Sequence, residues 1–181
     1  MATYKLIETQ TLTTAVGSVT FSSISQTFTD LKIVCSVRSS STSANVGNYD
    51  PQGIQFNSNT SNYSYRAIYG DGSSAISASG TTMTASTGAT VGRIQETGIN
   101  NNNSTASVYS SVEIYIPNYA GSTAKSFSVD YVQEQNQTAN NVGFQAQLWN
   151  DTAAITSIGL FIKDGNYMTH SSFSLYGIKN S

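Results

Sequence analysis

The clearest alternation of hydrophobic and polar positions lies between Ser111 and Val132. Apolar side chains occupy every second position in both halves of this stretch, at Val112, Ile114 and Ile116 and then at Phe127, Val129 and Tyr131. Successive side chains of a β-strand point to opposite faces, so each half predicts a strand with one buried face. Pro117 ends the first run because it has no N–H for a sheet, and Gly121 can take a positive φ where the connector turns. The stretch predicts an antiparallel pair.

Many other short stretches have the composition and alternation of strands. They cover residues 3–12, 18–24, 30–38, 53–57, 63–69, 90–97, 142–149, 155–162 and 167–178. The low-complexity stretch 73–90 predicts only weak strands, and no stretch has the apolar period and caps of a helix. A short connector separates 18–24 from 30–38, so these two are predicted to lie side by side. The pattern predicts an all-β fold, a single-domain antiparallel β-sandwich over residues 1–181 that is jelly-roll-like.

Turn residues divide these strands. Asp71 and Gly72 predict a turn, and Asp164-Gly165-Asn166 predicts a hairpin turn with a positive φ. The asparagine run Asn100–Asn103 is interpreted as a solvated loop tip. The polar loops Ser39–Asp50 and Gly98–Ser107 are predicted to be the outward tips of the domain, since polar loops tolerate change.

The chain carries few charges. Charged residues make up 10% of it, against about 25% in ordinary globular proteins. The eight Lys and Arg are scattered and the net charge is −2, so the sequence predicts neither nucleic acid nor a membrane surface as partner. No apolar signal core or membrane-length apolar run occurs, which predicts a protein neither classically secreted nor membrane-spanning. Cys35 is the single cysteine, so no internal disulfide forms.

Candidate catalytic groups are sparse. His170 is the single histidine, and Ser171, Ser172 and Asp164 near it suggest a hydrolase triad. A triad is defined by geometry rather than by sequence proximity, and no G-x-S-x-G elbow is present, so a strand or surface histidine is the preferred interpretation. Cys35 falls on the apolar face of its strand and predicts a small buried residue. One Cys and one His exclude a Cys/His zinc site, and the sequence predicts no cofactor and no enzyme.

Carboxylates are dispersed along the chain. Asp71 and Asp164 each precede a glycine, where turn formation explains them, and a calcium ion held by carbonyls and one or two carboxylates remains the alternative. A glycosidase needs two convergent carboxylates, for which Glu113, Glu134 and Asp130 are the candidates. Their places on polar strand faces favour solvation instead.

Tyrosines gather in two places. One group shares a strand face and the other surrounds the central strand pair: Tyr63, Tyr65 and Tyr69, then Tyr109, Tyr115 and Tyr119. Exposed tyrosine rings stack on sugars or bury in protein interfaces, whereas inward ones fill the core. The predicted partner-binding residues are Tyr63, Tyr65, Tyr69, Tyr115 and Tyr119.

Several segments resemble one group of proteins. They are YKLIETQTLTTAVGSVTFSSISQTFTDLKIVCSVRSS, NYSYRAIYGDGS, EIYIPNYAGSTAKSFSVDYVQEQN, LWNDTAAITSIGLF and SFSLYGI. Together they resemble small virion structural proteins of tailed bacteriophages, including cyanophages. Residues 74–108 lie outside the resemblance. The matching segments have no catalytic content, and no functional residues are carried over from the family.

The resemblance implies a phage structural protein, either associated with the head or part of a tail fibre, and the favoured interpretation is a capsid decoration (cement) protein. Such a protein binds the outer surface of the assembled head, bridges major capsid protein subunits and stabilises the lattice by mass action. A decoration protein of this kind is expected to be a homotrimer on the virion. The chain begins at Met1 and shows no coiled-coil attachment segment, which favours a decoration protein over a fibre. The alternative is a tail-fibre or head-fibre tip that binds a host receptor or glycan, and an enzyme comes third.

Overall fold

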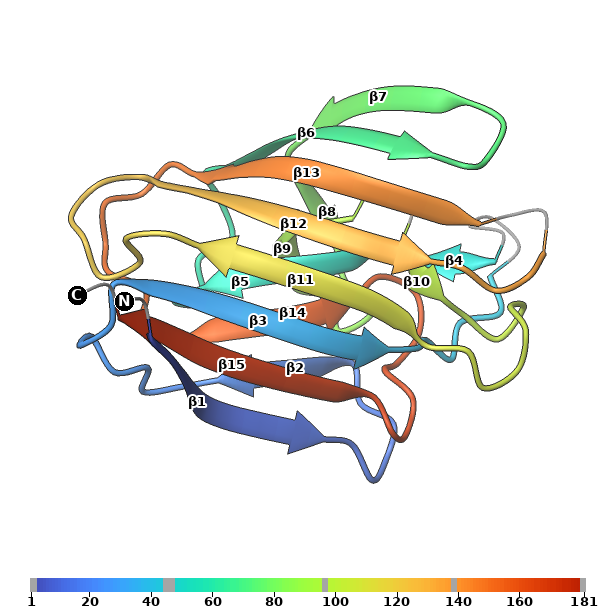
Figure 1. Cartoon of the computed structure of the whole chain (residues 1–181), viewed down its shortest axis with the longest axis horizontal. Helices are drawn as coiled ribbons and strands as arrows, with labels where there is room; N and C mark the ends of the chain where they lie inside the picture. The colour runs from blue at the N-terminus through green and yellow to red at the C-terminus, as the bar shows by residue number, and fades with distance from the viewer. Residues whose placement is uncertain (1–2, 44–47, 96–97, 138–139, 180–181) are drawn as a thin grey trace.

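The computed structural model describes residues 3–43, 48–95, 98–137 and 140–179, and these residues form strands and no helix (Figure 1). The large sheet has eight strands in the order β1 (Thr3–Thr11), β15 (Ser172–Lys179), β3 (Asp30–Val37), β11 (Ser110–Ile116), β12 (Lys125–Gln133), β13 (Asn141–Trp149), β6 (Tyr63–Gly70) and β7 (Ala75–Gly80). The small sheet has five, in the order β2 (Ser18–Phe21), β14 (Ile158–Ile162), β5 (Gln52–Phe56), β9 (Thr90–Arg93) and β8 (Thr82–Thr84). A third pair joins β4 (Tyr49–Asp50) to β10 (Ile99–Asn100).

The two sheets form an antiparallel sandwich, which confirms the predicted all-β fold. Figure 1 shows the small sheet behind the large one, with β7 at the upper edge and β1 at the lower edge. Apolar side chains from both inner faces form one main cluster, in which Phe56 of the small sheet contacts Phe127 and Trp149 of the large sheet at ring-centroid distances of 5.2 and 5.4 Å. The jelly-roll connectivity stays a prediction. Among the described residues no helix is long and apolar enough to cross a membrane.

The central pair of strands is confirmed. β11 and β12 are antiparallel neighbours, and Ile114 lies opposite Val129 with both side chains fully buried. The connector differs in detail, because Asn118 rather than Gly121 takes the positive φ, at 48°. Gly121 is required for close approach instead, since a Cβ there would lie 2.4 Å from the Asn118 side-chain oxygen.

Two sequence predictions about neighbours are wrong. β2 and β3 lie in different sheets, because β11 and β15 occupy both edges of β3 and β2 pairs with β14. Asp164-Gly165-Asn166 is no hairpin turn either, since it carries the chain from β14 in the small sheet to β15 in the large one. Gly165 does not take a positive φ. By contrast, Asp71-Gly72 forms the predicted turn, with Gly72 at a φ of 85° between β6 and β7.

The predicted outward tips are buried in part where the structure describes them. Residues 44–47 of the first loop lie outside the described residues, but Ser39, Asp50 and Asn100 are fully buried, and the second residue of the asparagine run, Asn101, is buried too. The pairing of β4 with β10 packs the two loops together at one end of the sandwich. Buried Arg38 also holds the second loop, donating hydrogen bonds to backbone oxygens within residues 104–108. The solvated-tip interpretation therefore holds for neither loop as a whole.

Candidate functional site

β13 presents Val142 and Phe144 to solvent, and its inner face carries two glutamines beside the buried Trp149. Val142 and Phe144 are 59% and 41% exposed, whereas Gln145 and Gln147 are buried. Inside, the Gln147 amide donates to the Gln145 side-chain oxygen at 2.6 Å and to the backbone oxygen of Arg93 at 3.1 Å. These hydrogen bonds offset the cost of burying polar groups. Nothing comparable offsets the exposure of the apolar face, which makes that face a candidate site.

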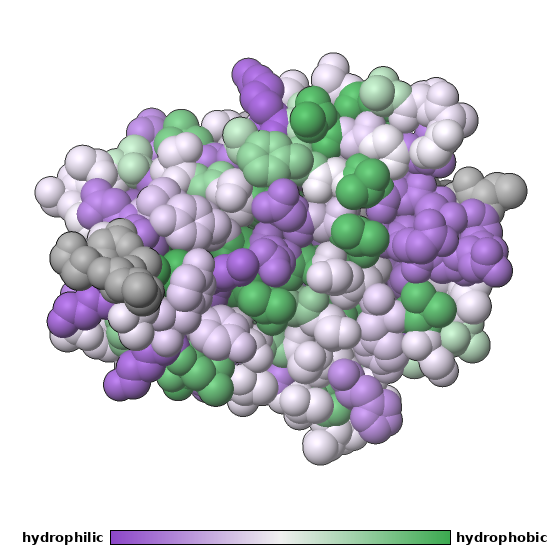
Figure 2. Space-filling model, in the orientation of Figure 1, coloured by the Kyte–Doolittle hydropathy of each residue, from purple (hydrophilic) through white to green (hydrophobic). Residues whose placement is uncertain are grey.

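The exposed apolar residues adjoin one another across three strands. Val132 of β12 pairs with Val142 of β13, and Phe144 of β13 pairs with Ile68 of β6. Cross-strand partners share a face, so these four residues form one surface, which we call the apolar patch. Val132 is 45% and Ile68 63% exposed. Figure 2 shows hydrophobic surface over these strands, next to strongly hydrophilic loops at one end of the sandwich. Contiguous exposed apolar surface of this kind marks interaction sites.

A shallow hollow lies within the apolar patch. Its volume is about 610 Å³, and Ile68, Val142, Phe144 and Ala75 line it around Gly70. A Cβ on Gly70 would meet only the backbone oxygen of Ser74, at 3.5 Å, so the missing side chain leaves the space open. The hollow can accept an apolar side chain of a partner.

Acidic groups border this hollow. Asp130 belongs to its lining, and an adjoining hollow of about 550 Å³ is lined by Asp71 and Glu134 among polar residues. Asp71 accepts hydrogen bonds from the backbone N–H groups of Ser73 and Ser74, which lower the pKa of its carboxyl below the ordinary value and confirm the turn interpretation of Asp71. The rim therefore suits a partner that places basic groups beside an apolar side chain.

A second group of exposed tyrosine and leucine side chains lies toward the other edge of the outer face of the large sheet. Tyr4 and Leu6 of β1 are 59% and 50% exposed, and Tyr115 of β11 is 39% exposed. The Tyr115 hydroxyl donates to the Asp30 carboxylate at 2.8 Å, and this hydrogen bond together with partial burial raises the Tyr115 pKa to about 12. Tyr115 is thus held in place as a neutral ring.

The structure corrects most of the predicted tyrosine contacts. Tyr63, Tyr65 and Tyr69 do share one face of β6, but it is the inner face. Tyr63 is 4% and Tyr65 5% exposed, and Tyr119 is fully buried. Burial leaves these three rings no free surface for a partner. Tyr69 is half-buried, and Tyr115 alone of the five predicted residues is well exposed.

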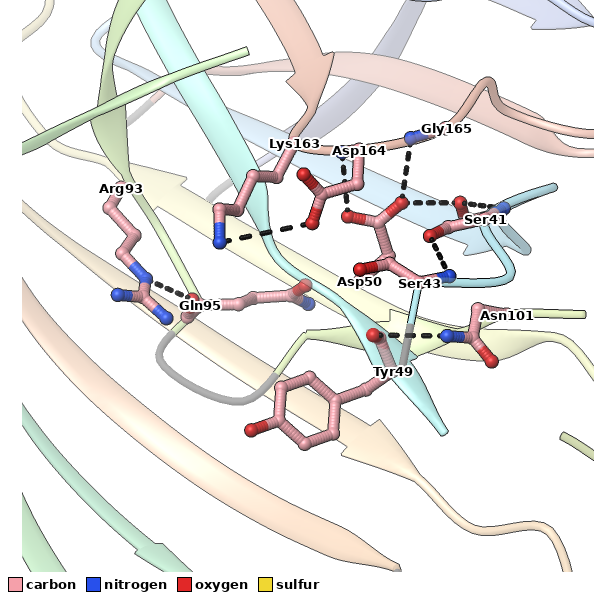
Figure 3. Close-up of polar contacts among 11 residues, drawn as sticks. Ser41, Ser43, Tyr49, Asp50, Arg93, Gln95, Asn101, Lys163, Asp164 and Gly165 are labelled. Carbon is pink, nitrogen blue, oxygen red and sulfur yellow. Dashed lines mark hydrogen bonds and ion pairs between the residues drawn. The ribbon is translucent and has the colours of Figure 1, made fainter. Parts of the chain in front are cut away.

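A buried polar cluster around Asp50 closes the end of the sandwich where the loops Ser39–Asp50 and Gly98–Ser107 pack together (Figure 3). Asp50 accepts hydrogen bonds from the Ser39 hydroxyl at 2.5 Å and from the backbone N–H groups of Asp164 and Gly165, both at 3.1 Å. Burial raises the Asp50 pKa above its ordinary value, and the three donors oppose that rise. The carboxylate points at groups of its own chain, so the cluster fastens three segments together.

The candidate catalytic groups lie apart. His170 is exposed at a turn with a φ of 69°, and no hydrogen bond joins its side chain to Ser171, Ser172 or Asp164 in the described structure. Cys35 is buried as predicted, and desolvation raises the pKa of its thiol. Across the described ranges, no group of three or more His, Cys, Asp and Glu side chains could hold a metal ion.

Two of the three candidate carboxylates do come together. Glu113 of β11 lies directly opposite Asp130 of β12 on the outer face. Glu113 is ion-paired with Lys32 at 2.7 Å, and this contact raises the pKa of the lysine. Glu134 accepts a hydrogen bond from the backbone N–H of Asn136, beyond the end of the strand. Glu113 and Glu134 thus have an ion-pairing and a hydrogen-bonding role on the surface, and the Asp130 charge adds to the rise of the Lys32 pKa.

No protein family model matches the chain, and no curated protein matches it.

Proposed function

We propose that this protein is a virion structural protein of a tailed bacteriophage, which docks the outer face of its large sheet on the assembled head as a decoration protein. The observation that carries the docking surface is the apolar patch, at Ile68, Val132, Val142 and Phe144. The sequence resemblance supports the phage assignment. The low charge, 10% of residues, suits a protein that packs against other proteins at high local density.

The size of the patch sets the strength of one contact. Full burial of a Val, Ile or Phe side chain contributes about 1.5–3 kcal/mol, so covering four half-exposed side chains contributes on the order of 4 kcal/mol. That free energy alone supports only weak binding. A decoration protein of this kind therefore gains its hold from several contacts at once, and it stabilises the assembled lattice because it binds that state alone.

Copy number in purified particles tests this proposal. Quantitative mass spectrometry of phage particles that contain the protein should give a stoichiometry that matches the capsid lattice. Val142→Ser combined with Phe144→Ser should abolish binding to particles that lack the protein, whereas Leu6→Ser, of similar exposure at the far edge, should retain it. A few copies per particle, or loss of binding in Leu6→Ser alone, would contradict the proposal.

A glycan-binding fibre tip is the second candidate function. The observation that favours it is the exposed ring of Tyr115 beside Tyr4, because exposed aromatic faces stack on sugars. In that case the isolated protein should bind host surface glycans, and Tyr115→Ala should weaken this binding while particle stoichiometry stays at a few copies.

A further inference from the structure

The two edges of the large sheet differ in how they are protected. The β1 edge carries Lys5 and Glu8, and its pairing with β15 shifts register between Leu6 and Glu8. Charges and bulges of this kind keep other strands from adding to an edge. The β7 edge, with the sequence AISASG, has no charge and no proline, and it pairs with β6 in unbroken register. The edge at β7 is open to strand addition.

Backbone groups on the far side of β7 are available. β7 pairs with β6 alone, and the next strand, β8, belongs to the small sheet (Figure 1). Among the described residues no hydrogen bond reaches the outer edge of residues 75–80. The small sheet offers less, since its edge strands β2 and β8 have four and three residues against six in β7. An unpaired edge of this length is a template for one more strand.

We propose that the strand is β7 of a second copy, paired antiparallel about a two-fold axis. The chain from Ser73 to Gly92 contains no charged residue, so identical edges bring no like charges together. The pairing would also cover Ile76, which is 38% exposed on β7. The two large sheets would then become one continuous sheet. The decoration-protein interpretation predicts a trimer instead, so the mass of the assembly distinguishes the two.

Symmetry restricts the register of this pairing. A two-fold axis between antiparallel strands is perpendicular to the sheet, so it leaves outward side chains outward. Directly opposed residues share a face, so one residue must lie opposite its own copy. Ala78 is the residue that fits, because Ile76 then lies opposite Gly80 of the second copy. Gly80 has room for no side chain of its own, since the ring of Tyr65 covers it within 2.7 Å of a Cβ position.

The paired form also has a consequence for docking. The perpendicular axis would place both apolar patches on one side of the joined sheet, so a dimer would offer two weak contacts instead of one. Linked contacts bind far more tightly than single ones. The dimer itself does not depend on the docking proposal, because it is measured on the isolated protein.

Disulfide trapping tests the register. Ala78→Cys should form a covalent dimer on mild oxidation, whereas Ser126→Cys, exposed on the outer face of β12, should not. The wild type is the second control, because its one thiol, Cys35, is buried. Peptide mapping of the Ala78→Cys dimer should show a disulfide between the two copies of the β7 peptide. A cross-linking yield for Ala78→Cys no higher than that for Ser126→Cys would overturn the proposal.

Charges introduced at Ala78 test the pairing without a covalent bond. Five opposed residues make an interface below the ~1,200 Å² of stable complexes, so we expect the wild type to dissociate in the micromolar range in sedimentation velocity. Ala78→Lys and Ala78→Glu should each be monomeric, and their equimolar mixture should dimerise again. A wild type that stays monomeric at every concentration, or that forms trimers, would refute the two-fold pair. A monomeric wild type whose Ala78→Lys variant loses particle binding would assign the edge to a capsid strand instead.

Discussion

Asp50 is the residue on which the loop end of the sandwich depends. Its carboxylate accepts hydrogen bonds from Ser39, Asp164 and Gly165, which belong to two loops far apart in sequence. Backbone hydrogen bonds from Ser40 to Asn166 and from Met168 to Arg38 also join the two loops, and the buried acceptor adds hydrogen bonds to both. The cost is a buried ionisable group, whose pKa is raised by desolvation.

Asp50→Asn should lower the free energy of unfolding by about 1–3 kcal/mol at neutral pH, because the new amide N–H groups leave the Gly165 N–H without an acceptor. The raised pKa also predicts a pH dependence. The folded state binds the Asp50 proton more tightly than the unfolded state does, so this group's contribution is greatest below the ordinary pKa and falls as the pH rises through the folded pKa. Urea unfolding at several pH values should show a larger wild-type advantage at low pH.

Asp71→Asn is the matched control for that prediction. The Asp71 pKa is lowered, so its contribution has the opposite sign: it is present above the ordinary pKa and is lost as the pH falls. If both variants change the pH profile in the same direction, the assignment of Asp50 as the desolvated group is wrong.

Substitution by alanine should affect stability at Gly165 but not at Gly70. A Cβ on Gly165 would lie 2.5 Å from the Ser41 backbone nitrogen, whereas one on Gly70 would meet nothing closer than 3.5 Å. We expect Gly165→Ala to cost about 1–3 kcal/mol of stability through backbone displacement. Gly70→Ala should leave the melting temperature nearly unchanged but reduce particle binding, since it fills the hollow. Equal melting temperatures for the two variants would contradict this account of Gly165.

At the scale of elements, β13 departs from the usual arrangement of a sandwich strand. Its buried glutamines, Gln145 and Gln147, meet polar groups beneath them, including the backbone oxygen of Arg93 in β9. That arrangement leaves Val142 and Phe144 outside. The apolar patch is therefore coupled to the polar interior through the alternation of one strand.

Substitutions on the two faces of β13 should show this inversion. Gln145→Leu removes the acceptor of the Gln147 amide inside the sandwich, and we expect it to cost about 1–3 kcal/mol despite its greater hydrophobicity. Val142→Thr, on the outer face, should change stability by less than about 0.5 kcal/mol. Chemical denaturation of both variants measures the difference. If the Gln145→Leu variant were more stable than the wild type, the hydrogen bond between Gln147 and Gln145 would not stabilise the fold.

The sequence predicts strands better than it predicts neighbours or faces. β11 and β12 could be predicted because their alternation and Pro117 are local. β13 could not be oriented, because both of its faces contain large side chains and the choice depends on β9, distant in sequence. The neighbours of β3 likewise come from residues far along the chain. The apolar patch could not be predicted for the same reason: the alternation of Val142 and Phe144 is visible in the sequence, but not which face the small sheet covers.

At the scale of the whole molecule, the described interior has two unequal parts. The main apolar cluster fills most of the space between the sheets, whereas Met83, Ala85 and Val91 form a separate small cluster around β8 and β9 of the small sheet. Local stability follows buried apolar contact, and every residue of β7 is exposed or half-buried, so β7 should open more readily than the strands of the main cluster. The proposed pairing edge thus lies in the region that is weakest in the isolated chain.

Hydrogen exchange should report both features in one experiment. Amides of β3 and β11 should exchange only through global unfolding, because apolar residues cover them on the inner face and strands flank them on both sides. Amides of β7 should exchange faster by local opening. If β7 pairs with a second copy, its protection should rise with protein concentration while that of the β1 edge stays constant. Protection of β7 that is independent of concentration would show that the open edge is not occupied by the same strand of another molecule.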